Sequence, residues 1–155
     1  ARIFLKKVKS PENFGVAKII HNKIEKIIEK PKKFISNYAI TGLYFFDNKV
    51  VNYAKKLKPS KRGEIEITDI LNIYKGSENL HYEHIGRGAI WSDAGKIEDM
   101  TNVSAFVQSV EKVQSIKIAC LEEIALSKKW INKKIILKNI NFYGNCDYSI
   151  YLKKL

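Results

Sequence analysis

The alternation of apolar and polar residues predicts strands in the first part of the chain. Apolar residues fill much of residues 2–9, and turn-forming residues 10–13 follow. Residues 16–20 and 23–28 lie on either side of His21-Asn22, which predicts a hairpin. Residues 38–46 are apolar at nearly every position, as in a central strand that is covered on both faces. This run is much too short to cross a bilayer.

Helical spacing becomes dominant further along the chain. It predicts one helix between Asp47 and Pro59 and another over residues 67–74, with a strand near residues 80–84. Apolar residues then recur every three or four positions from Ile97 to Val113, and shorter helical patterns follow over residues 121–130 and 148–155. This order predicts an α/β body with a mixed sheet and flanking helices, residues 1–115, and a helical C-terminal appendage, residues 116–155.

Composition limits the classes of function. The 155 residues are 45% hydrophobic, enough for one folded domain, and this excludes a disordered tail. A net charge of +12 suits phosphorylated ligands, nucleic acid or anionic lipid, but only three of the 28 basic residues are arginine. This argues against nucleic acid. Without a secretory signal pattern, and with Cys120 and Cys146 expected as free thiols, we expect a cytoplasmic protein.

Residues 86–95, Gly-Arg-Gly-Ala-Ile-Trp-Ser-Asp-Ala-Gly, combine flexible backbone, a large aromatic and a lone carboxylate. The two leading glycines would let the backbone approach a ligand closely, and Trp91 would form a rigid wall beside it. Asp93 could hold a hard cation. By itself, however, the Asp-Ala-Gly sequence favours a turn in which Asp93 caps the following helix.

Residues 86–95 resemble the metal-binding segment of the sugar nucleotidyltransferases, specifically the glucose-1-phosphate thymidylyltransferases, which usually have Thr where this chain has Ala94. Further segments resemble the same family in the same order, over nearly the whole chain: residues 11–16, 29–31, 36–47, 59–68 and 117–125. The resemblance implies a Rossmann-like nucleotidyltransferase fold. The family's Gly-rich nucleotide-binding loop and its first metal carboxylate have no match here. We therefore expect the C-terminal, sugar-binding half of the enzyme, inactive by itself.

The resemblance also implies a reaction. Members of this family transfer a nucleotidyl group from dTTP to glucose 1-phosphate and release pyrophosphate, which yields dTDP-glucose for deoxysugar (dTDP-rhamnose) synthesis. In-line transfer between two polyanions needs charge neutralisation and alignment more than covalent help. The implied cofactor is Mg²⁺, with Asp93 as one ligand. The implied partners are dTTP, glucose 1-phosphate, the missing half and further copies of the chain, a tetramer in the family.

Matching positions assign roles to individual residues. Lys30 matches the family's sugar-phosphate lysine, and Arg62 lies in a matching basic loop where it could also meet phosphate. Glu29 matches the acceptor of hydrogen bonds from sugar hydroxyls. The backbones of Gly15 and Ile40 would contact the sugar, beside the wall formed by Trp91. By themselves, Lys30 and Glu29 are typical of surface charges, Gly15 of a turn and Ile40 of a core. Arg62 is equally typical of an exposed loop arginine with a structural role.

A regulatory nucleotide site is also known in this family, and four residues here fall in the segments that form it: Arg87, Ile118, Glu122 and Glu123. Helix packing explains the last three equally well. Two alternatives to the enzyme stay open at this point. One is a non-catalytic basic module that binds nucleic acid, and the other is an oligomerisation piece with a relic site.

Overall fold

The computed structural model describes residues 1–155, which divide into two units, Ala1–Trp91 and Ser92–Leu155. Each unit has a hydrophobic core of its own. The boundary predicted after residue 115 falls inside the second unit, because the long helix before it belongs there and not to the α/β body. Helical spacing showed that this helix exists but could not show which unit it joins.

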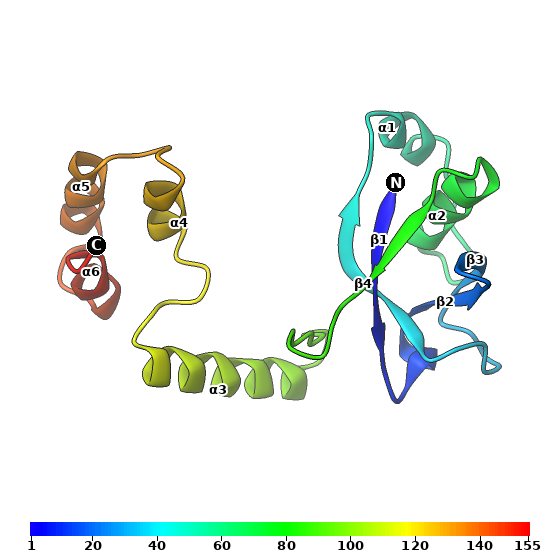
Figure 1. Cartoon of the computed structure of the whole chain (residues 1–155), viewed down its shortest axis with the longest axis horizontal. Helices are drawn as coiled ribbons and strands as arrows, with labels where there is room; N and C mark the ends of the chain where they lie inside the picture. Colours follow the sequence, from blue (N-terminus) through cyan, green and yellow to red (C-terminus); the bar gives the residue numbers. More distant parts are fainter. The chain divides into compact units, whose positions relative to one another are not determined.

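The first unit is built on a five-stranded mixed sheet with the order β3-β2-β4-β1-β5 (Figure 1). The strands are β1 (Arg2–Lys7), β2 (Gly15–Ile20), β3 (Lys23–Glu29), β4 (Tyr38–Phe45) and β5 (His81–His84). Only β1 and β5 pair in parallel, and the other neighbours are antiparallel. The predicted mixed sheet with flanking helices is confirmed.

The β2–β3 hairpin turns at His21 and Asn22, whose φ angles are 47° and 59°. Two successive residues in the left-handed region match the twist of the flanking strands, and asparagine accepts this conformation readily. At the open end of the hairpin the register pairs Gly15 with Glu29. The hairpin therefore brings two of the predicted sugar-binding residues side by side.

Three helical segments accompany the sheet: a short 3₁₀ turn η1 (Pro11–Asn13), α1 (Lys49–Ala54) and α2 (Ile67–Gly76). Helix α2 covers one face of the sheet, and its Leu71 joins a buried cluster from the strands that consists of Ile3, Leu5, Ala17, Ile27 and Ile40. The hydroxyl of Tyr74 donates a hydrogen bond to Asp47 Oδ1 at 2.5 Å. Burial, together with this bond, raises the pKa of Tyr74 to about 12, so the hydroxyl keeps its proton and fastens α2 to the segment after β4.

Strand β4 lies in the middle of the sheet, as predicted, but only part of it is covered. Ala39, Ile40 and Thr41 are buried, whereas the side chains of Leu43 and Phe45 are 49% and 59% exposed. The prediction that both faces are covered is wrong for this second part. An apolar run alone does not reveal which of its residues a neighbouring element covers.

The second unit contains four helices: α3 (Ile97–Gln114), α4 (Leu121–Ser127), α5 (Lys133–Tyr143) and α6 (Asp147–Leu152). Its buried cluster comes from α5, α6 and the residue before α4, and consists of Cys120, Ile136, Ile140, Tyr151 and Leu152. Helix α5 was not predicted, although Asn132 caps it by accepting a bond from the N–H of Ile135 at 3.2 Å.

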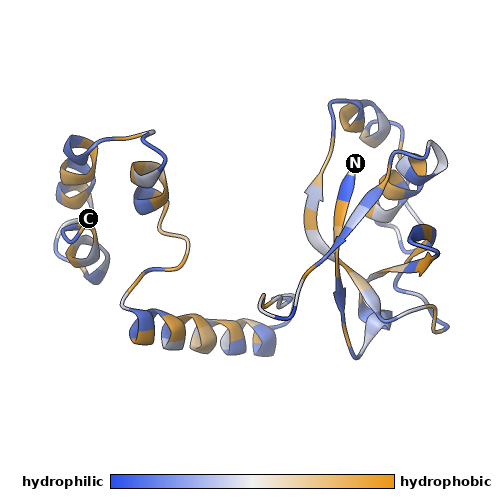
Figure 2. Ribbon diagram, in the orientation of Figure 1, coloured by the Kyte–Doolittle hydropathy of each residue, from blue (hydrophilic) through white to orange (hydrophobic).

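Helix α3 differs from the other three, because none of its residues is buried. Figure 2 shows apolar and polar residues alternating along it. Met100 is 57% exposed, and Ile97 and Val113 are each 85% exposed. The predicted helix is confirmed, but its apolar stripe is not part of a core within this unit. No helix in the chain has the length and apolar character needed to span a membrane.

Candidate functional site

Three residues predicted to bind the sugar lie together in the first unit. Gly15 begins β2 and pairs with Glu29 at the end of β3. An ideal Cβ placed on Gly15 would lie 3.0 Å from Glu29 Oε2 and 3.8 Å from Ile40 Cδ1. It would also lie 2.9 Å from Thr68 Cγ2, which is closer than real Cβ contacts allow. Glycine is needed here because Thr68 and Glu29 occupy the volume that a side chain would take.

Lys30 follows Glu29 directly and has an unusual backbone conformation. Its φ is 40°, in the left-handed region that non-glycine residues seldom adopt. The Lys30 N–H donates to the carbonyl of Phe14 at 3.0 Å, which holds this conformation in place. The side chain of Lys30 is exposed, and its charge lowers the pKa of the adjacent Glu29 carboxyl. Lys30 thus places a cation at the exposed edge of the cluster formed by Gly15, Glu29 and Ile40.

Trp91 contacts Phe14, the residue that precedes β2. Its ring meets that of Phe14 edge-on, with centroids 5.2 Å apart and an interplanar angle of 63°. Phe14 immediately precedes Gly15, so the contact fixes the indole beside the start of β2. The role of Trp91 as a wall beside the sugar stays a prediction.

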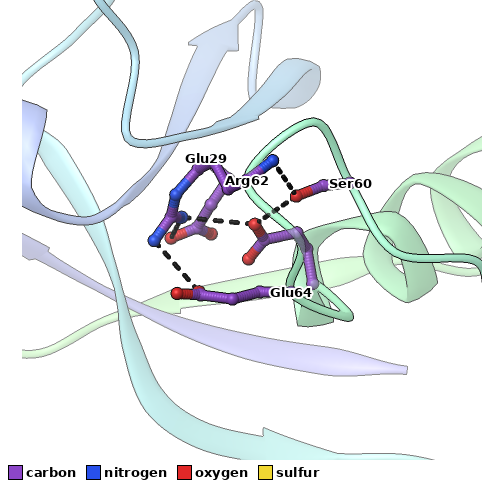
Figure 3. A network of polar contacts seen from close by, with 5 residues as sticks. Glu29, Ser60, Arg62 and Glu64 are labelled. Carbon is purple, nitrogen blue, oxygen red and sulfur yellow. Dashed lines mark hydrogen bonds and ion pairs between the residues drawn. The ribbon is translucent and has the colours of Figure 1, made fainter.

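Arg62 lies among acidic side chains, as Figure 3 shows for Glu29 and Glu64. Its Nη1 is 3.2 Å from Glu66 Oε1 and 3.9 Å from Glu29 Oε1, and its Nη2 is 3.0 Å from Glu64 Oε2. The Ser60 hydroxyl also donates to Glu66 Oε1, at 2.9 Å. All charged partners of this arginine are carboxylates of its own unit. The phosphate contact expected of Arg62 stays a prediction.

The Glu29 carboxyl is harder to ionise than an ordinary glutamic acid. Partial burial raises its pKa most, and the negative charge of Glu66 raises it further. The charges of Lys30 and Arg62 and a hydrogen bond from Thr68 lower the pKa again, but less. A carboxylate held in this way has acceptor capacity that hydroxyl donors of a bound ligand can use.

Asp93 belongs to the second unit, where its side chain is exposed. The interpretation that Asp93 caps the next helix is wrong, because Lys96 is the N-cap residue of α3 and no side chain bonds there. The Asp93 carboxylate instead bends over Gly95, with Oδ2 3.1 Å from the position of an ideal Cβ. The chain contains no cluster of three or more His, Cys, Asp or Glu side chains that could hold a metal. One carboxylate still suits Mg²⁺, which keeps several waters and binds substrate phosphates.

Two of the four residues predicted to form a regulatory site hold helices together. The buried carboxylate of Glu122 accepts hydrogen bonds from the Tyr143 hydroxyl at 2.8 Å, from the Asn139 amide at 3.3 Å and from the Tyr148 hydroxyl. Glu123 accepts one from the Tyr151 hydroxyl at 2.5 Å. These bonds join α4 to α5 and α6.

The other two regulatory candidates have simpler surroundings. Ile118 is exposed in the second unit, and its N–H donates to Glu111 Oε1 at 2.9 Å. Arg87 is exposed in the first unit. A nucleotide-binding role for these four residues stays a prediction, and packing accounts for both glutamates.

The sequence analysis did not single out Phe14, Glu66 or Thr68. All three lie inside segments that carried the resemblance, residues 11–16 and 59–68. The sequence contained a signal for Glu66 and Thr68. After Gly63, polar residues alternate with isoleucines, which predicts that Glu64, Glu66 and Thr68 face the same side of an extended segment. What this side faces became visible only in the structure.

Comparison with known proteins agrees with these observations. A family model described as Nucleotidyl transferase matches residues 1–110. A glucose-1-phosphate thymidylyltransferase from Neisseria gonorrhoeae is 42% identical over 156 residues, which cover 100% of this chain and 54% of that protein. The enzyme of the same name from Mycobacterium tuberculosis (strain H37Rv) is 34% identical over 154 residues, 99% of this chain and 54% of that protein.

A solved structure from Bacillus anthracis, assigned as a glucose-1-phosphate thymidylyltransferase in complex with a sucrose, superposes with a TM-score of 0.60. It is 46% identical and covers 68% of this chain and 42% of that chain. The chain spans about half the length of the curated relatives that it matches. The resemblance found in the sequence is confirmed, and its placement in the C-terminal half stays a prediction.

Proposed function

The chain belongs to the nucleotidyl transferase family, and from this premise we propose that it forms the sugar-phosphate-binding part of a glucose-1-phosphate thymidylyltransferase. The complete enzyme would transfer a nucleotidyl group from dTTP to glucose 1-phosphate and release pyrophosphate. One observation carries the proposal. The residues that the sequence assigned to the sugar, Gly15, Glu29 and Ile40, are distant in the chain but meet at one place on the sheet.

Four of the residues assigned to the sugar phosphate have a chemical task in the proposal. The carboxylate of Glu29 accepts hydrogen bonds from sugar hydroxyls, and the absence of a side chain at Gly15 keeps the approach to the backbone open. Lys30 provides a positive charge next to the sugar, where the phosphate of glucose 1-phosphate would lie. The indole of Trp91, fixed by Phe14, gives the ring of the sugar an apolar wall.

Asp93 would contribute one oxygen ligand to Mg²⁺. When bound, the ion neutralises charge on the phosphates, whose mutual repulsion opposes the reaction. The other ligands of the ion would be waters and substrate phosphates, which Mg²⁺ commonly keeps in nucleotide-binding sites. The side chain of Asp93 is exposed and therefore accessible to such an ion.

A chimeric enzyme tests the proposal. This chain replaces the aligned 156-residue segment of the Neisseria gonorrhoeae relative, and pyrophosphate release is measured with dTTP, glucose 1-phosphate and Mg²⁺. We expect turnover. Replacement of Glu29 by Gln should lower kcat/KM roughly ten- to hundredfold. The reason is that the neutral amide accepts hydrogen bonds from sugar hydroxyls less strongly than the charged carboxylate does. Asp93→Asn should weaken the dependence on Mg²⁺.

Matched controls lie on the same strand. Glu25→Gln and Lys26→Ala change β3 residues that are exposed, and they should leave turnover unchanged. Lys30→Ala should raise the KM for glucose 1-phosphate. A chimera that folds and turns over equally well with Glu29→Gln and with Glu25→Gln contradicts the proposed role of this cluster.

A further inference from the structure

Glu66 is a buried glutamate close to a second acid, Glu29. Its side chain lies at the N-terminal end of α2, and the residue is 8% exposed. It raises the pKa of Glu29, so the two carboxyls repel each other. A buried carboxylate is costly unless charges or hydrogen bonds compensate it. Glu66 obtains both, from the Ser60 hydroxyl at 2.9 Å and from Arg62 Nη1 at 3.2 Å.

These contacts order the loop that carries Arg62. The Ser60 hydroxyl donates to Glu66 and also accepts from the Arg62 backbone N–H at 3.1 Å. The Ser60 N–H donates to the Glu64 carbonyl at 2.8 Å, and the Gly63 N–H donates to the Ser60 carbonyl at 2.9 Å. Glu66 thus holds both the loop, through Ser60, and the arginine side chain.

Arg62 shares one nitrogen between the buried acid and the candidate site. Nη1 lies 3.2 Å from Glu66 Oε1 but 3.9 Å from Glu29 Oε1. Glu66 is therefore the closer of these two partners, and Glu29 is the more distant one. The Glu64 contact at Nη2 involves a side chain that is 62% exposed, which makes it the weaker restraint.

We propose that Glu66 is a positioning residue, which acts through Arg62 to fix the guanidinium beside Glu29 at the sugar-phosphate site. The inference rests on the proposed function for its ligand. The positioning itself rests on the contacts of Glu66 with Ser60 and Arg62 alone. Glu66 has no contact with substrate in this role.

The positioning is tested on the 155-residue chain without any ligand. NMR relaxation and hydrogen exchange of the Arg62 Nε–H report whether the guanidinium is held. We expect Glu66→Gln to mobilise this group and Glu64→Gln to leave it ordered. Thermal unfolding of both variants shows whether they remain folded. Equal Arg62 order in the wild type and in folded Glu66→Gln would overturn the proposal.

A double-mutant cycle with glucose 1-phosphate tests whether positioning matters for the ligand. When Arg62 is present, Glu66→Gln should weaken the binding of glucose 1-phosphate by about tenfold. In an Arg62→Gln background the same change should have almost no further effect, because the group through which Glu66 acts is gone. An effect of Glu66→Gln that persists undiminished in that background overturns the proposal. The proposed function fails if the wild-type chain does not bind glucose 1-phosphate and the chimera does not turn it over. In that case the Arg62 NMR result still decides whether Glu66 positions the guanidinium.

Discussion

Each unit buries one carboxylate almost completely, Glu66 in the first unit and Glu122 in the second. They are 8% and 7% exposed. Glu66 is compensated by a positive charge, Arg62, that it shares with other acids, whereas Glu122 is compensated by neutral donors, two tyrosine hydroxyls and an amide. Equal burial is thus achieved in two chemically different ways.

The difference separates a candidate site from a packing device. The arginine held by Glu66 reaches toward Glu29, which has acceptor capacity next to the exposed Lys30. The donors of Glu122 come from α5 and α6 and join these helices to α4. A buried carboxylate suggests a functional role when its cationic partner also contacts an accessible group. It suggests a structural role when its hydrogen-bond donors belong to helices packed against it.

The largest effect is expected from the replacement of Glu122 by Ala. The change leaves three donors without an acceptor and should reduce the free energy of unfolding of the second unit by about 2–4 kcal/mol. Hydrogen exchange of the α4, α5 and α6 amides measures this locally. The control is Glu123→Ala, which removes a single bond from Tyr151. Equal losses for the two variants would show that the three-donor arrangement is not what stabilises the helices.

A smaller loss is expected from Gly15→Ala in the first unit. The new methyl group would overlap Thr68 Cγ2 and press on Glu29, at an expected cost of about 1–3 kcal/mol. Urea unfolding followed by hydrogen exchange of the sheet amides checks this. Gly42→Ala is the matched control in β4, because nothing lies within 4 Å of a Cβ there. Thr68→Ser in the Gly15→Ala background removes the overlapping methyl and should restore part of the stability.

Acid should act on Glu122 and Glu29 in opposite directions. Burial disfavours the Glu122 carboxylate, but hydrogen bonds from Tyr148 and Tyr143 outweigh it and hold its pKa below the ordinary value. Its stabilising contribution is therefore present above the pKa of an unfolded glutamate, about 4.3, and is lost as the pH falls through the lowered folded-state value. The pKa of Glu29 is raised, so the cost of ionising it disappears as the pH falls from neutral through its raised value.

The two directions can be measured separately. Unfolding free energies between pH 7 and pH 3, resolved by hydrogen exchange in each unit, are compared for the wild type, Glu122→Gln and Glu29→Gln. Glu122→Gln should flatten the acid loss of the helical unit, and Glu29→Gln should remove the gain in the sheet unit. A sheet unit with the same pH dependence in the wild type and in Glu29→Gln would show that Glu29 is not the group responsible.

The smallest effect is expected from an ion pair that is exposed and unshared. Lys18 Nζ lies 2.7 Å from Glu25 Oε2 across the hairpin, but the two side chains are 41% and 47% exposed. Lys18→Met should change the free energy of unfolding by less than about 0.5 kcal/mol, because water screens the pair. Urea denaturation checks this value. A larger loss would show that the exposure of an ion pair does not predict its contribution to the free energy of unfolding in this protein.

Sequence reasoning succeeded where a local signal was strong. The hairpin around His21-Asn22 and the helix from Ile97 were predicted and are present. Helix α5 was missed although six of its eleven residues are apolar and Asn132 caps it. The extent of burial along β4 and α3 was not predictable, since it depends on which elements come to cover them.

The sequence by itself determined the strands, most of the helices and the family, because periodicity, turn chemistry and motif spacing are local properties of the chain. Only the tertiary structure decided that Gly15 must be glycine because of Thr68, that Arg62 is surrounded by acids, and that Glu122 joins α4 to the helices after it. Each of these facts depends on side chains that are distant in the sequence, and folding alone brings such side chains into contact.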